Sequence, residues 1–90
     1  MNDFNFEDTY SLWSRVRTIL SQTMIPAQFQ AWIAPLVPLR VIENRSRLEV
    51  QVIAPNCFSV THINRRHKAR ISKAVELIAG QRASVECKVC

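Results

Sequence analysis

Glycine is almost absent from this 90-residue sequence, in which Gly80 is the only one. A phosphate-binding loop needs several glycines, so the sequence excludes a nucleotide site of that kind. No run of apolar residues approaches the ~18 that a membrane-spanning helix needs. The first ten residues, MNDFNFEDTY, also lack the basic and apolar parts of a secretion signal. We therefore expect a cytoplasmic chain with no membrane partner.

Side chains that would catalyse a reaction or bind a metal are also missing from the expected spacings. His62 and His67 are five residues apart, whereas two zinc ligands on one helix face are four apart. Cys87 and Cys90 form a C-x-x-C pair, but they fall on a predicted strand rather than at the helix N-terminus that activates a redox thiol. With Cys57 the cysteines are odd in number, which favours free thiols. The sequence predicts no enzyme, no metal site and no cofactor.

The residues that are present are typical of one small folded domain. Hydrophobic residues make up 48% of the chain and charged residues 21%, which is ordinary for a globular protein. The net charge is +5, from 12 Lys and Arg against 7 Asp and Glu. This surplus permits an anionic partner without requiring one. The segment from Arg65 to Lys73 holds five of the cations and no acid.

Hydrophobic periodicity predicts six elements in the order ααββαβ. Phe29, Trp32, Ile33 and Leu36 fall at i, i+3, i+4 and i+7, which is one face of a short helix. The expected helices span about 9–23, 26–34 and 57–79, and the expected strands span about 39–42, 47–53 and 82–89. The pattern predicts an α+β domain over residues 9–90, with helices covering a three-stranded sheet. Residues 1–8 are expected to form a flexible N-terminus.

Three short motifs occur in this order: Leu12-Trp13, Phe29-x-x-Trp32-Ile33-x-Pro35-Leu36 and Ala54-Pro55-Asn56-x-Phe58. Together they resemble the N-terminal domain of the bacterial replication initiator DnaA, over about Leu12 to Gly80. The resemblance implies a fold similar to the K-homology type without its G-x-x-G loop. It also implies an interaction module that contacts the replicative helicase DnaB, initiation regulators and other initiator copies. The ATPase and duplex-DNA-binding domains of the family lie further along its chain, so we expect this sequence to be an excised domain.

The resemblance also implies roles for individual residues. Trp13 matches a family tryptophan that mediates weak self-association, although packing in the core beside Val16 is an equal alternative. Phe58 matches a phenylalanine that contacts the helicase, and Asn56 of the same motif is placed with it, besides being a good helix cap. Gln28 stands where family members can have a glutamate that contacts the helicase. Self-association alone, through Trp13 and the edge of the sheet, is a further alternative.

A second function follows from the basic residues of the last predicted helix. Arg65, Arg66, Arg70 and Lys73 are candidate contacts for single-stranded DNA, and the last three share one face at i, i+4 and i+7. A weak nucleic-acid-binding domain is therefore the alternative to the interaction module. His67 lies in the apolar stripe of the same helix, where the family has a tyrosine, and we expect it to be partly buried with its polar atoms satisfied.

Overall fold

The computed structural model describes residues 2–3, 6–44 and 47–89. The elements are β1 (Asn2–Asp3), α1 (Phe6–Thr23), α2 (Pro26–Gln28), the π-helical turn η1 (Phe29–Ile33), β2 (Val37–Asn44), β3 (Arg47–Ala54), α3 (Cys57–His62), the π-helical turn η2 (Ile63–His67), α4 (Lys68–Ala79) and β4 (Arg82–Val89). This order confirms the predicted α+β class. The likeness to the K-homology fold stays a prediction.

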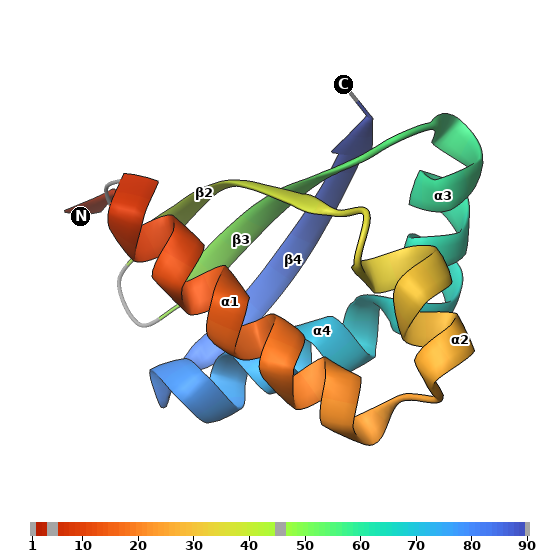
Figure 1. Ribbon diagram of the computed structural model, residues 1–90. Helices are drawn as coiled ribbons and strands as arrows, with labels where there is room; N and C mark the ends of the chain where they lie inside the picture. The colour runs from red at the N-terminus through yellow and green to blue at the C-terminus, as the bar shows by residue number, and fades with distance from the viewer. Residues whose placement is uncertain (1, 4–5, 45–46, 90) are drawn as a thin grey trace.

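The strands form one mixed sheet in the order β1-β2-β3-β4. β2 and β3 are an antiparallel hairpin, and β4 lies parallel to β3 on its other side, so that Val50 pairs with both Val41 and Val85. The segment α3–η2–α4 is the crossover that a parallel pair requires. In Figure 1, α1 crosses in front of the sheet and α4 runs beneath it. The three long strands that the sequence predicted are thus confirmed.

One hydrophobic core lies between the sheet and the helices. β3 contributes Leu48, Val50 and Val52, which are buried. Their alternation with polar residues is typical of a strand with one face in the core. α1 and α4 pack against each other and against the sheet, and their apolar stripes face this core. The fully buried members of these stripes and of η1 are Val16, Leu20, Ile33, Ile71 and Val75.

The N-terminal segment contains elements that the sequence pattern did not predict, and its flexibility stays a prediction. Asn2 and Asp3 pair with Glu43 and Ile42 of β2, which adds a fourth, two-residue strand to the three predicted. α1 begins at Phe6 rather than near residue 9. Two residues of backbone pairing give little periodicity in a sequence, so hydrophobic pattern alone could not reveal this strand.

The helix predicted over 57–79 is present from Cys57 to Ala79, but a π-helical turn interrupts its regular geometry. In η2 the N–H of Lys68 bonds to the carbonyl of Ile63, one residue further back than in an α-helix, and His67 leaves helical geometry with φ −122° and ψ −11°. α3 and α4 consequently run in different directions in Figure 1. The predicted end is confirmed, because Gly80 adopts φ 71° and caps α4 in the left-handed conformation.

Candidate protein-interaction site

An aromatic cluster joins η1 to α3. The ring of Trp32 stacks on His62 with 3.7 Å between centroids and 20° between planes. The same indole lies 5.8 Å from the ring of Phe58, centroid to centroid, at a tilt of 51°. Trp32 and His62 are half-buried, whereas Phe58 is 72% exposed. The cluster therefore presents one large apolar side chain to solvent on a packed aromatic base.

The start of α3 places Phe58 in that position. Asn56 is the N-cap residue, and its side-chain oxygen accepts a hydrogen bond from the backbone N–H of Ser59 at 2.8 Å. Phe58 follows in the first turn, and His62 comes four residues later on the same helix face. Asn56 is exposed, but its side-chain acceptor is committed to the cap. Its first role is thus structural, as the sequence had also suggested.

The opposite side of the cluster comes from α2 and η1. Pro26 occupies the first turn of α2, where its missing N–H costs nothing. In η1 the N–H of Ala34 bonds to the carbonyl of Phe29 at 2.9 Å, which is a π-helical step. Gln28 is exposed at the end of α2, four residues before Trp32. We call Gln28, Trp32, Phe58 and His62 the α2–α3 surface.

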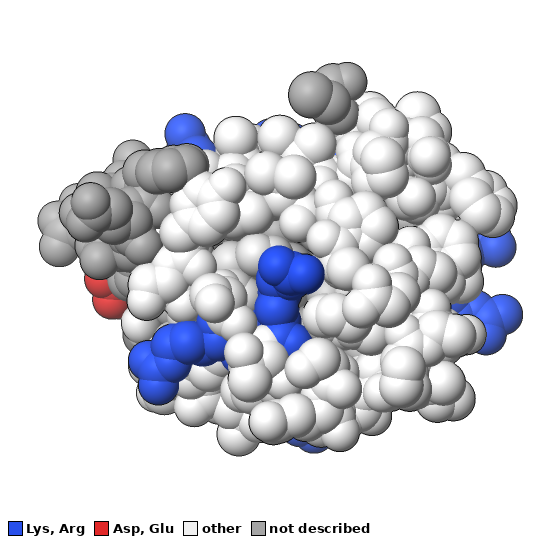
Figure 2. Space-filling model, in the orientation of Figure 1, with Lys and Arg blue, Asp and Glu red and all other residues white. Residues whose placement is uncertain are grey.

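Formal charge is absent from the sequence around this surface. No Lys, Arg, Asp or Glu occurs in residues 18–39 or in residues 50–64. In Figure 2 the surface over α2 and α3 is correspondingly white, and blue side chains appear only at its right-hand edge. A partner would therefore meet apolar and neutral polar groups here, with cations only at the border.

The four predicted nucleic-acid contacts are all exposed. Arg65 and Arg66 belong to η2, whereas Arg70 and Lys73 belong to α4, beyond the break at His67. The shared face of Arg66, Arg70 and Lys73 at i, i+4 and i+7 stays a prediction. Within the described ranges the only ion pair joins other residues, Lys88 and Glu86. The four cations are thus not neutralised by a neighbouring carboxylate in that part of the chain.

His67 lies at the break between η2 and α4. It is 5% exposed, and neither ring nitrogen has a hydrogen-bond partner among the described residues. Its burial is as predicted, but the expectation that its polar atoms are satisfied is wrong. Burial, followed by the positive charge of His62, Arg70 and Arg66, lowers the pKa of His67. The ring is therefore neutral at neutral pH.

Trp13 lies in the core rather than on the surface. Its side chain is 3% exposed, and its indole N–H lacks a hydrogen-bond acceptor in the described part of the chain. Of the two alternatives for this residue, the structure shows core packing. Self-association through Trp13 stays a prediction, and it would require the side chain to emerge from its present position.

The sequence interpretation missed the part that Trp32 and His62 take in the surface. Trp32 was considered only as part of an apolar helix face and of a family motif, and His62 was considered only as a metal ligand. A signal was available, because Phe58 and His62 are four residues apart and therefore neighbours on α3. The contact with Trp32 could not be found this way, since it joins segments that are about 30 residues apart.

Other candidate chemistry is not assembled. Across residues 2–3, 6–44 and 47–89, no three His, Cys, Asp or Glu side chains lie together as a metal site would require. Cys57 is exposed, whereas Cys87 is buried, and this burial raises the pKa of the Cys87 thiol. Cys90, the other half of the C-x-x-C pair, lies outside the described residues. No described helix is long and apolar enough to cross a membrane.

The family model of the DnaA N-terminal domain matches residues 10–76 of this 90-residue chain. The chain belongs to this family. The match runs from α1 into α4, so it includes Trp13, Gln28, Asn56 and Phe58 together with the four cations. Membership of the DnaA N-terminal domain family assigns the chain to the initiation of DNA replication.

Proposed function

We propose that this DnaA N-terminal domain is a protein–protein interaction module that contacts the replicative helicase DnaB through the α2–α3 surface. The observation that supports it most is Phe58, which is 72% exposed and rests on Trp32. Exposed aromatic side chains on a rigid base are the usual anchors of protein interfaces. Initiation regulators and other initiator copies are further partners in this proposal. The domain catalyses no reaction and acts in the cytoplasm.

The test compares two side chains of equal exposure. Phe58→Ala removes the proposed anchor, and Leu77→Ala removes a leucine that is 73% exposed on α4, away from the α2–α3 surface. Both variants should fold, since truncating an exposed side chain changes stability by less than about 0.5 kcal/mol. We expect Phe58→Ala to weaken binding to purified DnaB about tenfold or more, measured by calorimetry. Leu77→Ala should bind as the parent chain does.

Equal helicase affinity for the parent chain and Phe58→Ala, with both folded by circular dichroism, would contradict this function. The same two variants are then measured against the initiation regulators. If Phe58→Ala leaves every such affinity unchanged, the α2–α3 surface is not an interaction site.

Binding of single-stranded DNA is the second candidate, and it is favoured by the four exposed cations, which have no carboxylate partner among the described residues. An aromatic side chain, Phe58, lies on the neighbouring helix for a base to stack upon. Four phosphate contacts would give a slope of about −3 in a plot of log affinity against log salt. Titration of a labelled oligonucleotide at low and moderate salt measures this slope. Failure to bind at low salt excludes this function.

A further inference from the structure

Three hollows lie in a row along the seam between α1 and α4. The first, about 170 Å³, lies between the end of α1 and the middle of α4, where Ile19 faces Lys73 and Leu77. The second shares Ile19 with the first, and it shares Arg15 and Ile78 with the third. The hollows therefore adjoin one another along this seam. We call the three together the α1–α4 groove and define it by Arg15, Ile19, Arg70, Lys73, Leu77 and Ile78.

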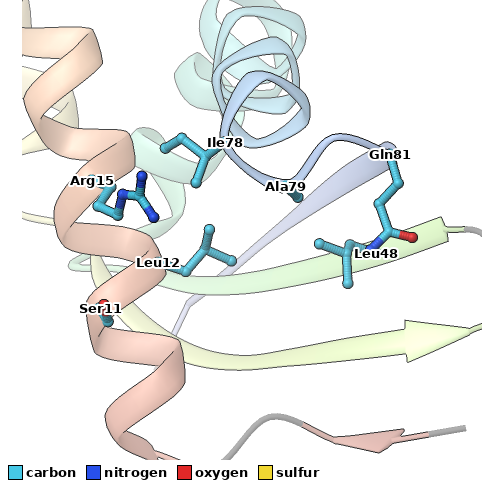
Figure 3. A pocket seen from close by; sticks show the side chains of 7 residues that line it. All are labelled: Ser11, Leu12, Arg15, Leu48, Ile78, Ala79 and Gln81. Carbon is cyan, nitrogen blue, oxygen red and sulfur yellow. The ribbon is translucent and has the colours of Figure 1, made fainter.

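Figure 3 shows the third hollow, at the far end of the groove. Leu12 and Arg15 of α1 face Ile78 and Ala79 of α4 across it, and Leu48 of β3 lies on the other side. This hollow has a volume of about 270 Å³. Its walls are thus two helices, and its base is formed partly by the sheet.

Apolar side chains line most of the groove. Leu20 and Ala74 are buried at its base, and Ile19 and Ile78 are half-buried along its length. Leu77 stands at the rim and is 73% exposed. An exposed leucine beside half-buried isoleucines gives a partner apolar surface to cover without any unfolding of this domain.

Among the side chains that the structure describes, the charges that line the groove are all positive. Arg15 comes from α1, and Arg70 and Lys73 come from α4. No described Asp or Glu side chain lines any of the three hollows, and the carboxylate of Glu76 on α4 accepts a hydrogen bond from the backbone N–H of Ala83 at 3.1 Å. In Figure 2 blue side chains stand over α1 and along the lower edge near α4, whereas red appears only at the left.

We propose that the α1–α4 groove binds an acidic amphipathic helix of a partner protein. From Ser11 to Thr23, α1 lines the groove over about 18 Å, which is the length of a helix of about 12 residues. Apolar side chains of such a helix would pack on Ile19, Leu77 and Ile78, and its carboxylates would pair with the cations at the rim. This surface is separate from the α2–α3 surface, so the inference does not depend on the helicase proposal.

A second copy of this chain is a poor occupant on grounds of charge. The long helix α4 is itself basic, with Lys68, Arg70 and Lys73 all exposed. Docking α4 of another copy into the groove would bring like charges together, which costs free energy. The groove therefore favours a partner of opposite charge.

The test uses two synthetic helical peptides of about 14 residues with identical leucine positions. One has glutamate on both flanks of the leucine stripe, and the other has lysine at the same positions. We expect the acidic peptide to bind the chain at least tenfold more tightly than the basic one, measured by fluorescence anisotropy. Amide shifts in nuclear magnetic resonance spectra should map to Ile19, Leu77 and Ile78.

Matched variants locate the interaction. Lys73→Glu and Arg65→Glu change the charge equally at two exposed positions, but only Lys73 lines the groove. We expect Lys73→Glu to weaken binding of the acidic peptide about tenfold and Arg65→Glu to weaken it less than threefold. Leu77→Asp should also weaken it about tenfold.

Three outcomes would overturn the proposal. The first is equal loss of affinity in Lys73→Glu and Arg65→Glu, which would mean that only net charge matters. The second is a change in the sedimentation mass of the free chain on Leu77→Asp, which would make the groove an interface between copies. The third is a single-stranded oligonucleotide that shifts the same amides and binds more tightly than the acidic peptide.

Discussion

The α2–α3 surface and the α1–α4 groove each expose one large apolar side chain to nearly the same extent. Phe58 is 72% exposed and Leu77 is 73% exposed. Their surroundings differ, because Phe58 lies in a segment without formal charge, whereas Leu77 lies beside Lys73 and Arg70. The exposure of an apolar side chain therefore indicates that a partner can bind there, and the charge around that side chain indicates whether the partner surface is neutral or acidic. A neutral partner surface suits the first, and an acidic one suits the second.

The largest expected effect tests whether the two surfaces share one core. Ile33 lies beneath the α2–α3 side and Ile71 belongs to α4, and both side chains are 0% exposed. Ile33→Ala and Ile71→Ala should each lower the free energy of unfolding by about 2–5 kcal/mol, because each leaves a cavity in a packed interior. Urea unfolding followed by tryptophan fluorescence and by circular dichroism measures this cost. Two separate transitions in either variant would show that the surfaces belong to independent units.

The next largest effect is a loss of stability at the start of α3, next to the α2–α3 surface. Asn56→Ala removes the acceptor for the Ser59 N–H and should cost about 1 kcal/mol, whereas Asn56→Asp keeps an acceptor and should cost less. Thermal unfolding measures both variants. If Ala and Asp are equally destabilising, the hydrogen bond at the cap does not stabilise α3, and Asn56 would be better explained as a partner contact.

Much of this architecture was predictable because it is local. Alternation of apolar residues defined β3 and β4, and a 3.6-residue period defined α1 and the buried stripe of α4. Asn56 was correctly identified as a helix cap because its side-chain chemistry acts within one turn. These features need only neighbours in the sequence.

The features that could not be predicted depend on distant contacts or on single extra residues. The π-helical turn η2 adds one residue to a turn, and one added residue is invisible to a periodicity measured over several turns. Burial of Trp13 depends on how α1 sits against the start of β2, which the α1 sequence does not specify. For the same reason the stack of Trp32 on His62 had no sequence signal in η1.

A smaller effect is the pH dependence of stability that arises from His67, which lies between η2 and α4. The pKa of His67 is lowered in the folded state, chiefly by burial, so the unfolded chain binds a proton more readily. The contribution of this group to stability is present in full above the ordinary histidine pKa of about 6.5, and it is lost as pH falls below that value. We expect unfolding midpoints to decrease between pH 7.5 and pH 5.5.

The variant His67→Leu separates this residue from other titrating groups. It removes the proton-binding ring but keeps an apolar side chain at the same place, so its midpoint should depend less on pH than that of the parent chain. If parent and His67→Leu respond to pH identically, titration of His67 does not influence stability.

The smallest expected effect sharpens the contrast in charge. Gln28→Glu introduces a carboxylate on the neutral α2–α3 surface, at the position where family members can have one. If DnaB docks there, its affinity should rise about two- to fivefold, the range of an exposed ion pair. Gln30→Glu is the matched control, since Gln30 is also exposed and lies on η1. An equal response of both variants would show that helicase affinity follows net charge alone.

The parallel pairing of β3 with β4 has a consequence for biosynthesis. Leu48 pairs with Ala83, so the sheet closes only after the whole crossover has been made. During translation the hairpin of β2 and β3 can form early, but the edge of β3 that later pairs with β4 stays unpaired until β4 has been made. Other nascent chains and chaperones can bind this unpaired edge of β3. Slower elongation through residues 55–81 would prolong the exposure of the edge.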